Sequence, residues 1–350
     1  IPRVAALLPP GNRLLEFDPK AMTFKRDAGS PLAAGAVIVD ETSMVDVHLA
    51  DALLQAIGDG TRLVLVGDVD QLPSVGPGAV LRDLLDCGKV PSVRLTRIFR
   101  QAEASLIVQN AHRINQGEPP ELPPPGKTDA DFFVVERRDP DAALETILEL
   151  VRTRIPRRFG LDPVRDVQVL VPMHRGVVGS VGLNAALQRA LNPVGPSVER
   201  GGIVYRLGDK VMQLKNDYER GVYNGDVGVV TKVDEEQNQI GVRFDDLGGP
   251  EVVYDGPDLD QLNLAYACTV HKSQGSEYPA VVVAMLSSHF VMLSKNLLYT
   301  AVTRGKRLVV LVADPRAIRV ALSNERAESD RRTRLSARIH SLFREPGELG

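Results

Sequence analysis

The sequence predicts an α/β protein with two domains built on parallel sheets and a small all-β domain inserted in the second. Apolar, β-branched segments that end in polar residues alternate with segments of helical spacing. A proline-rich run separates two such regions, and residues 206–260 change to short strands joined by turn residues. The 350 residues are enough for several cores of this kind.

The first domain begins with a strand–helix–strand pattern. Residues 34–44, AGAVIVDETSM, contain a β-branched run that is typical of a strand buried on both faces of a parallel sheet. Residues 48–60 have helical spacing, and residues 61–73 contain a second apolar strand. Ligands of such sheets bind beyond the carboxyl ends of the strands. The polar residues at these ends are Asp40, Glu41, Gly67, Asp68 and Gln71.

The proline-rich segment 119–129 is expected to be a linker, although it contains the ending of a phosphate-binding loop, Gly126-Lys127-Thr128. Such a loop reads G-x-x-x-x-G-K-[ST] and lies between a strand and a helix. Position 121 is Glu instead of Gly, and residues 123–125 are prolines without the N–H that would bind a phosphate. We therefore predict that this segment binds no nucleotide.

The second α/β domain is expected over residues 130–205 and 261–340, with 341–350 as a tail. Residues 131–136 and 166–176 are predicted strands, and residues 181–193 a helix stopped by Pro193. The insertion at 206–260 contains Asn224-Gly225, a strong tight-turn pair, and is predicted to form a small barrel.

Composition excludes some classes of function. The net charge of −3 gives no overall positive field, so any contacts to nucleic-acid phosphates must be local. Two cysteines, Cys87 and Cys268, provide neither a disulfide framework nor metal-site spacing, which favours a reducing, cytoplasmic compartment. No apolar run reaches membrane-spanning length.

Five segments occur in an informative order: VIVDETSM, VLVGDVDQLPSVGPG, VRLTRIFRQ, TVHKSQGSEY and LLYTAVTRGKR. With them the chain resembles superfamily 1 helicases, and most of all the RecD-like branch, which moves 5′→3′ on DNA. The resemblance covers residues 12–314. It implies two RecA-like motor domains with ATP in the cleft between them, and an SH3-like barrel inserted in the second.

The resemblance also implies roles for individual residues in ATP hydrolysis. Asp40 corresponds to the carboxylate of the Mg²⁺ site, and Glu41 to the catalytic base. Gln71 would contact the γ-phosphate and couple it to DNA. Arg100 and Arg304 would reach the γ-phosphate as stabilisers of negative charge.

Further positions are implied around the nucleotide and the DNA. Gln274, Gly275 and Glu277 would line the nucleotide cleft, with Glu277 near the ribose. A DNA strand would be contacted by Thr269 and His271, and by His174 and Arg175 in PMHRGVVGSVGLN. Residues 11–31 are similar to the hairpin that separates duplex strands.

The chain also departs from the family pattern. The P-loop, expected upstream of Asp40, is absent, and the first residue is Ile1. We therefore expect a fragment whose first motor domain, residues 1–118, is incomplete and which is inactive alone. Thr42 stands where the family commonly has Ala.

The leading interpretation is an ATP-dependent 5′→3′ DNA helicase of repair or recombination. Its partners would be single-stranded DNA, single-strand/duplex junctions and recombination or nuclease subunits, with ATP and Mg²⁺ as cofactors. A non-catalytic DNA-binding or complex-forming module and the helicase part of a conjugation relaxase remain alternatives. TVHKSQGSEY together with the barrel disfavours an ATPase that never contacts DNA.

Overall fold

The protein is described by a computed structural model that divides into two compact units, residues 1–98 with 325–350 and residues 99–324. Residues outside the described part are 1–3, 8–14, 16, 19–20, 22, 96–103, 125, 128, 245–250, 325–332 and 344–350.

The first unit contains a parallel sheet of strand order β1-β4-β5. Its strands are β1 (Val4–Leu7), β4 (Ala36–Val39) and β5 (Arg62–Leu65). Helix α1 (Val47–Ala56) connects β4 to β5 and begins where the Asp46 carboxylate accepts the Leu49 N–H at 2.8 Å. Helices α2 (Val80–Asp86) and α10 (Leu335–Leu342) pack against each other.

The sheet of the first unit is buried on one face within the described residues. Val37 and Val39 are buried in a cluster with Leu53 of α1. Val64 on β5 remains 46% exposed, and exposure alternates along both strands. The expectation of a strand buried on both faces is therefore wrong for β4, although the parallel strand–helix–strand unit is present.

A short antiparallel hairpin lies within the predicted segment 11–31. It pairs β2 (Phe17–Asp18) with β3 (Thr23–Phe24). Leu15, which is 5% exposed, accepts the N–H groups of Lys25 and Arg26 through its carbonyl. The hairpin is thereby anchored to the core of the first unit.

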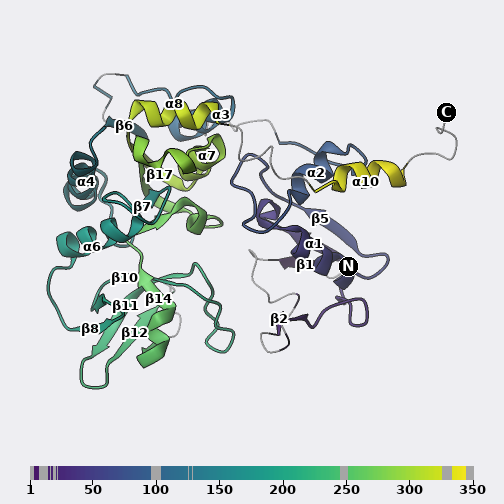
Figure 1. The fold of residues 1–350 in the computed structure, drawn as a ribbon, viewed down its shortest axis with the longest axis horizontal. Helices are drawn as coiled ribbons and strands as arrows, with labels where there is room; N and C mark the ends of the chain where they lie inside the picture. Colours follow the sequence, from purple (N-terminus) through teal and green to yellow (C-terminus); the bar gives the residue numbers. More distant parts are fainter. Residues whose placement is uncertain are drawn as a thin grey trace. The chain divides into compact units, whose positions relative to one another are not determined.

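The second unit is built on a five-stranded parallel sheet of order β15-β7-β16-β17-β6 (Figure 1). Alternate residues of the central strands join the core that contains helices α4 (Pro140–Glu149) and α6 (Ser180–Leu191). The remaining residues of these strands are buried on the opposite face. Both faces are therefore covered, as is usual for a parallel sheet. The strands are β6 (Phe132–Glu136), β7 (Val167–Val171), β15 (Ala267–Thr269), β16 (Tyr278–Met285) and β17 (Gly305–Ala313).

Helices of the second unit form two groups. Helix α7 (Lys295–Thr303) packs against α3 (Leu106–Asn115) and α8 (Pro315–Ser323). Helix α4 (Pro140–Glu149) packs against α6 (Ser180–Leu191) and continues through a π-helical turn, Leu150–Arg154, into α5 (Ile155–Phe159). None of the described helices has the length and apolarity needed to cross a bilayer.

The inserted all-β domain is an antiparallel sheet of order β13-β12-β11-β10-β14 (Figure 1). A hairpin of β8 (Ser197–Arg200) and β9 (Ile203–Arg206) precedes the sheet and contacts it. The domain therefore begins before residue 206 and ends after residue 260. Its strands are β10 (Lys210–Gln213), β11 (Val227–Asp234), β12 (Gln239–Arg243), β13 (Glu251–Asp255) and β14 (Leu262–Leu264).

The boundary between the units differs from the expected linker at 119–129. Helix α3 belongs to the second unit because it packs against α7. The proline-rich segment is bound to α3 itself: Asn110 accepts the Glu121 N–H at 2.6 Å and donates to the Glu121 carbonyl at 2.9 Å. The segment is therefore part of the second unit rather than a spacer between domains. Residues 325–350, expected largely within the second domain, group with the first unit.

Candidate nucleotide and DNA sites

Two polar loops of the first unit are joined at the carboxyl ends of β4 and β5. The Val39 carbonyl accepts the Val66 N–H at 2.7 Å and the Thr42 hydroxyl at 3.1 Å. The Thr42 N–H in turn donates to the Val66 carbonyl at 2.9 Å. These bonds hold the Asp40–Glu41 loop beside the loop that leads to Gln71, as the parallel topology predicts.

Asp40 and Glu41 have different surroundings within this loop. The Asp40 side chain is exposed, and its Oδ1 accepts the Glu41 N–H at 2.7 Å. Glu41 has φ 51° and ψ 38°, a left-handed conformation that costs a non-glycine residue about 1–2 kcal/mol. Strain of this kind is frequent at functional positions. It turns the chain sharply directly after the strand.

The donor set at Asp40 suits a magnesium ion held partly by a phosphate ligand. Mg²⁺ retains several waters and is usually bound by one or two carboxylates together with substrate phosphates. Among the described residues, no three His, Cys, Asp or Glu side chains gather as a metal-binding group. A single accessible carboxylate therefore fits Mg²⁺ that arrives with a nucleotide.

Gly67 allows the two loops to approach closely. A Cβ at this position would lie 2.9 Å from Leu81 Cδ2 and 3.0 Å from the Thr42 nitrogen. Further along the loop, Gln71 Nε2 donates to Asp68 Oδ2 at 3.4 Å. Gln71 is half-buried and follows the carboxyl end of β5, as predicted.

Arg304 is a buried arginine in the second unit, 4% exposed at the end of α7. It donates from Nη1 to the Ser276 carbonyl at 3.2 Å and from Nη2 to Thr303 Oγ1 at 3.4 Å. Both acceptors are neutral. The buried Nε has no hydrogen-bond partner within the described part of the chain. A buried guanidinium normally has its charge paired, so this one can accept an anion.

Three predicted nucleotide residues lie close to Arg304 in the fold. Gln274 ends the 3-10 turn Val270–Ser273, and Gly275 has φ +74°. Glu277 is exposed and forms an ion pair with Lys306 at 2.9 Å. Glu277 directly precedes β16 and Lys306 lies on β17, so the pair is at the amino edge of the sheet, as is Arg304.

The loop after β7 carries two of the predicted DNA contacts. His174 and Arg175 are exposed, and His174 Nδ1 lies 2.9 Å from Ser180 Oγ at the start of α6. Although the residue is exposed overall, partial desolvation of the imidazole, followed by the positive charge of Lys272, lowers the pKa of His174. The end of this loop requires glycine at position 179, because a Cβ there would lie 2.3 Å from the Arg175 carbonyl oxygen.

The segment after β15 lies at the same carboxyl edge as this loop, since β15 pairs with β7. Thr269 is only 5% exposed, so its predicted contact with DNA does not start from an open surface. His271 is half-buried in the following turn. Lys272, which was not singled out from the sequence, is half-buried, and burial lowers its pKa. Its positive charge contributes to the lowered pKa of His174.

The second unit thus separates its predicted residues between two edges of one sheet. The nucleotide residues Gln274, Gly275, Glu277 and Arg304 are at the amino ends of β16 and β17. The DNA residues His174, Arg175, Thr269 and His271 are at the carboxyl ends of β7 and β15. The rule that ligands bind beyond the carboxyl ends of parallel strands fits the predicted residues of the first unit. It does not locate Arg304, which lies at the amino end of β17.

Two other sequence-based expectations concern lone basic residues. Arg100 lies outside the described residues. Lys127 follows helix α3 and precedes strand β6, which is the reverse of the strand–loop–helix order of a P-loop. The order of elements therefore supports the prediction that Lys127 binds no phosphate.

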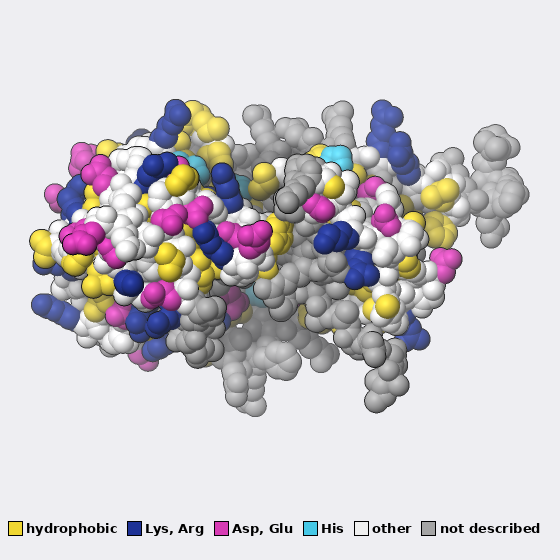
Figure 2. Space-filling model, turned by 90° about the horizontal axis from the view of Figure 1, so that it is seen from below, with side chains coloured by type: hydrophobic (Ala, Val, Ile, Leu, Met, Phe, Trp, Pro, Cys, Tyr) yellow, Lys and Arg dark blue, Asp and Glu magenta, His cyan; other side chains and the backbone are white. Residues whose placement is uncertain are grey.

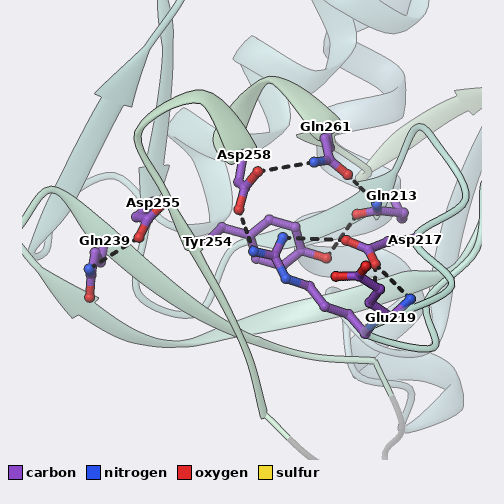
Figure 3. Close-up of polar contacts among 9 residues, drawn as sticks. Gln213, Asp217, Glu219, Gln239, Tyr254, Asp255, Asp258 and Gln261 are labelled. Carbon is purple, nitrogen blue, oxygen red and sulfur yellow. Dashed lines mark hydrogen bonds and ion pairs between the residues drawn. The ribbon is translucent and has the colours of Figure 1, made fainter.

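A polar cluster lies within the inserted all-β domain, which corresponds to the predicted barrel (Figure 3). Tyr254, which is fully buried, donates to Gln213 Oε1 at 2.8 Å, and Gln213 Nε2 donates to Gln261 Oε1 at 3.1 Å. Arg220 forms ion pairs with Asp258 and Asp217. These contacts fasten the loop before β11 to the turn that follows β13.

A second polar centre joins the barrel to α6. Asp209, which is fully buried, accepts hydrogen bonds from Gln188 and Asn192 of the α6 region, from the Tyr266 hydroxyl and from the Arg206 N–H. Four donors satisfy the carboxylate. No motif in the sequence identifies this residue, because its partners are distant along the chain.

Charges on the surface are mixed. In Figure 2, Lys and Arg side chains are interspersed with Asp and Glu side chains over the face shown, in keeping with the net charge of −3. DNA binding would therefore depend on local groups such as those after β7 and β15.

Comparison with known proteins identifies related domains and a related fold. Family models match an AAA domain over residues 21–124, an ATP-dependent RecD-like DNA helicase SH3 domain over 183–244, and a UvrD-like helicase C-terminal domain over 264–312. A crystal structure of Pif1 helicase from Bacteroides has a TM-score of 0.51 and 20% identity, and covers 89% of this chain and 76% of that one. The fold is therefore similar to that of this helicase, and together with the SH3 match it agrees with the predicted α/β class and inserted SH3-like domain.

Relatives in sequence identify the branch. A protein named ATP-dependent RecD2 DNA helicase from Deinococcus radiodurans is 36% identical over 94% of this chain and 43% of its own length. A protein named RecBCD enzyme subunit RecD from Mycobacterium tuberculosis is 34% identical over 89% of this chain and 55% of its own length. The chain belongs to the RecD-like helicases, and it spans about half the length of these two relatives.

Proposed function

We propose that this chain is the motor portion of an ATP-dependent DNA helicase that moves 5′→3′ on single-stranded DNA in repair or recombination. Two observations carry the proposal. The first unit contains a strained carboxylate loop. The second contains Arg304, a buried arginine bonded only to neutral acceptors in the described residues. Phosphoryl transfer needs both kinds of group.

The proposed chemistry assigns a step to each residue. Glu41 accepts a proton from the water that attacks the γ-phosphorus, while the bond to the leaving oxygen of ADP breaks. Arg304 stabilises the negative charge of the transferring phosphoryl group. Asp40 would hold Mg²⁺, which neutralises phosphate charge. Gln71, on the loop fastened to that of Asp40, would contact the γ-phosphate.

The proposed DNA contacts are electrostatic. His174, Arg175, His271 and Lys272 lie after β7 and β15, and their donors suit phosphate oxygens. We propose that the β2–β3 hairpin separates strands at a single-strand/duplex junction. Binding should weaken steeply with salt, since contacts to phosphates release counterions.

The test is ATP hydrolysis with and without single-stranded DNA, in a form of the chain that includes a phosphate-binding loop. Glu41→Gln should retain ATP binding and lose about 10²–10⁴-fold in turnover. Arg304→Ala should lose about 10³–10⁵-fold while DNA binding is preserved. Glu145→Gln and Arg319→Ala, both exposed on helices, are matched controls.

The outcomes discriminate between functions. Normal turnover in Glu41→Gln would remove Glu41 as the base, and an unchanged rate in Arg304→Ala would remove the arginine from the site. If the unsubstituted protein with a phosphate-binding loop binds DNA but does not hydrolyse ATP, a non-catalytic DNA-binding module would be favoured. The mycobacterial relative is named as a subunit of an enzyme, RecBCD, which supports our proposal of partner subunits for recombination or nuclease activity. A cytoplasmic location, suggested by the two free cysteines, is also a proposal.

A further inference from the structure

Lys210 is a buried lysine contributed by the inserted barrel. It is the first residue of β10 and is only 3% exposed. Lysine is rarely buried to this degree, because desolvating an ammonium group is costly. Its Nζ donates to the carbonyl of Val167 at 3.1 Å, and Val167 is the first residue of β7. The barrel therefore inserts a positive charge at the amino edge of the parallel sheet.

The same ammonium lies against the next strand of that sheet. Lys210 Nζ is 5.7 Å from the ring centroid of Tyr278, the first residue of β16, within the range of a cation–π interaction. Tyr278 is 7% exposed, so the ring has little freedom to move.

Tyr278 is in turn bonded to Arg304. Its N–H donates to the Arg304 carbonyl at 2.8 Å, and Ser276, two residues earlier, accepts from the Arg304 guanidinium. Burial raises the pKa of Tyr278, and the nearby charge of Arg304 opposes that rise. The backbone and the guanidinium of Arg304 are thus both held by the segment that the Tyr278 ring anchors.

We propose that Lys210 is a positioning residue for Arg304 and acts through Tyr278, so that the inserted barrel sets the orientation of the arginine. The catalytic consequence rests on the function proposed above for Arg304. A ligand that displaces β10 would displace the Tyr278 ring and with it the arginine. If Lys210 only capped the end of β7, its loss would leave Arg304 unchanged.

The experiment follows the Nε–Hε resonance of Arg304 by ¹H–¹⁵N NMR, assigned from its disappearance in Arg304→Lys. Lys210→Met retains the apolar stem and removes the charge, and should shift this resonance by more than its line width. Lys210→Arg restores a cation and should return it toward the original position. Lys232→Met, exposed on β11, is the matched control and should leave it in place.

A second variant tests the same connection in case Lys210→Met does not fold. Tyr278→Leu removes the ring but keeps the N–H that donates to Arg304, and it should shift the same resonance. An unchanged Arg304 resonance in either variant, with barrel amide resonances intact, would overturn the proposal. The readout needs no ATP, so it can succeed or fail independently of the hydrolysis test. Where hydrolysis is present, Lys210→Met should lower kcat with KM unchanged.

Discussion

Substitution of Gly67 by alanine tests whether close contact between two loops positions the carboxylates. The added Cβ would lie 2.9 Å from Leu81 Cδ2, 3.0 Å from the Thr42 nitrogen and 3.1 Å from the Ser43 nitrogen. Two of these neighbours are backbone atoms and cannot rotate away. Overpacking of this kind costs about 1–3 kcal/mol. The loop that contains Glu41 should therefore separate from the loop after β5.

Amide hydrogen exchange measures this separation locally. The Thr42 N–H donates to Val66, and the Val66 N–H donates to Val39. A cost of about 1–3 kcal/mol corresponds to about 5- to 150-fold faster exchange at both amides, because each opens with the loop. Amides on α4, in the other unit, should keep their rates.

Gly58→Ala is the matched control for this substitution. Gly58 is in the same unit, does not require a positive φ, and has its nearest neighbour at 3.8 Å from an added Cβ. Alanine there should be neutral or stabilise by about 0.4–1 kcal/mol. Exchange at the Thr42 and Val66 amides that is equally slow in Gly67→Ala and Gly58→Ala would refute the close-contact argument.

Three further outcomes are expected. Asp209→Ala should destabilise the protein by about 3 kcal/mol or more in urea unfolding, because several buried donors lose their acceptor. The control Glu236→Ala, at an exposed position, should have little effect, and equal unfolding midpoints for the two variants would contradict the role of Asp209. Single-stranded DNA affinity should rise as pH falls below about 6.5, since His174 gains a proton only below its ordinary pKa, and His174→Gln should flatten this dependence at constant salt; parallel pH curves would exclude it. Lys127→Ala should leave nucleotide affinity unchanged in equilibrium titration, and a marked loss would make the proline-rich segment a phosphate site after all.

Local patterns predicted the elements that depend on local physics. The strand β7 and the helix α6, which ends before Pro193, are present where the sequence places them, because burial periodicity and the helix-breaking effect of proline act over a few residues. The Asp40–Glu41 and Gly67–Gln71 loops adjoin because strand order follows from the parallel strand–helix–strand unit.

Features that depend on distant contacts were not predictable in this way. Because α3 packs against α7, the boundary between the units lies before α3 and not at residues 119–129. The composition of the predicted linker does not reveal this contact. The left-handed backbone of Glu41 is stabilised by bonds to the neighbouring loop, against the preference of glutamate itself. Asp209 and Lys210 find their partners in elements that precede and follow the barrel.

The first and last strands of the inserted five-stranded sheet, β10 and β14, lie next to each other. Lys210 accepts the Ala265 N–H at 2.8 Å through its carbonyl, and β10 pairs antiparallel with β14. A segment whose two ends meet can be removed or exchanged without stretching the chain that surrounds it. Replacement of residues 212–263 by a two-residue turn should therefore leave the parallel sheet foldable. The same geometry would allow a different module to be inserted at this position during evolution without a change in the core of the host domain.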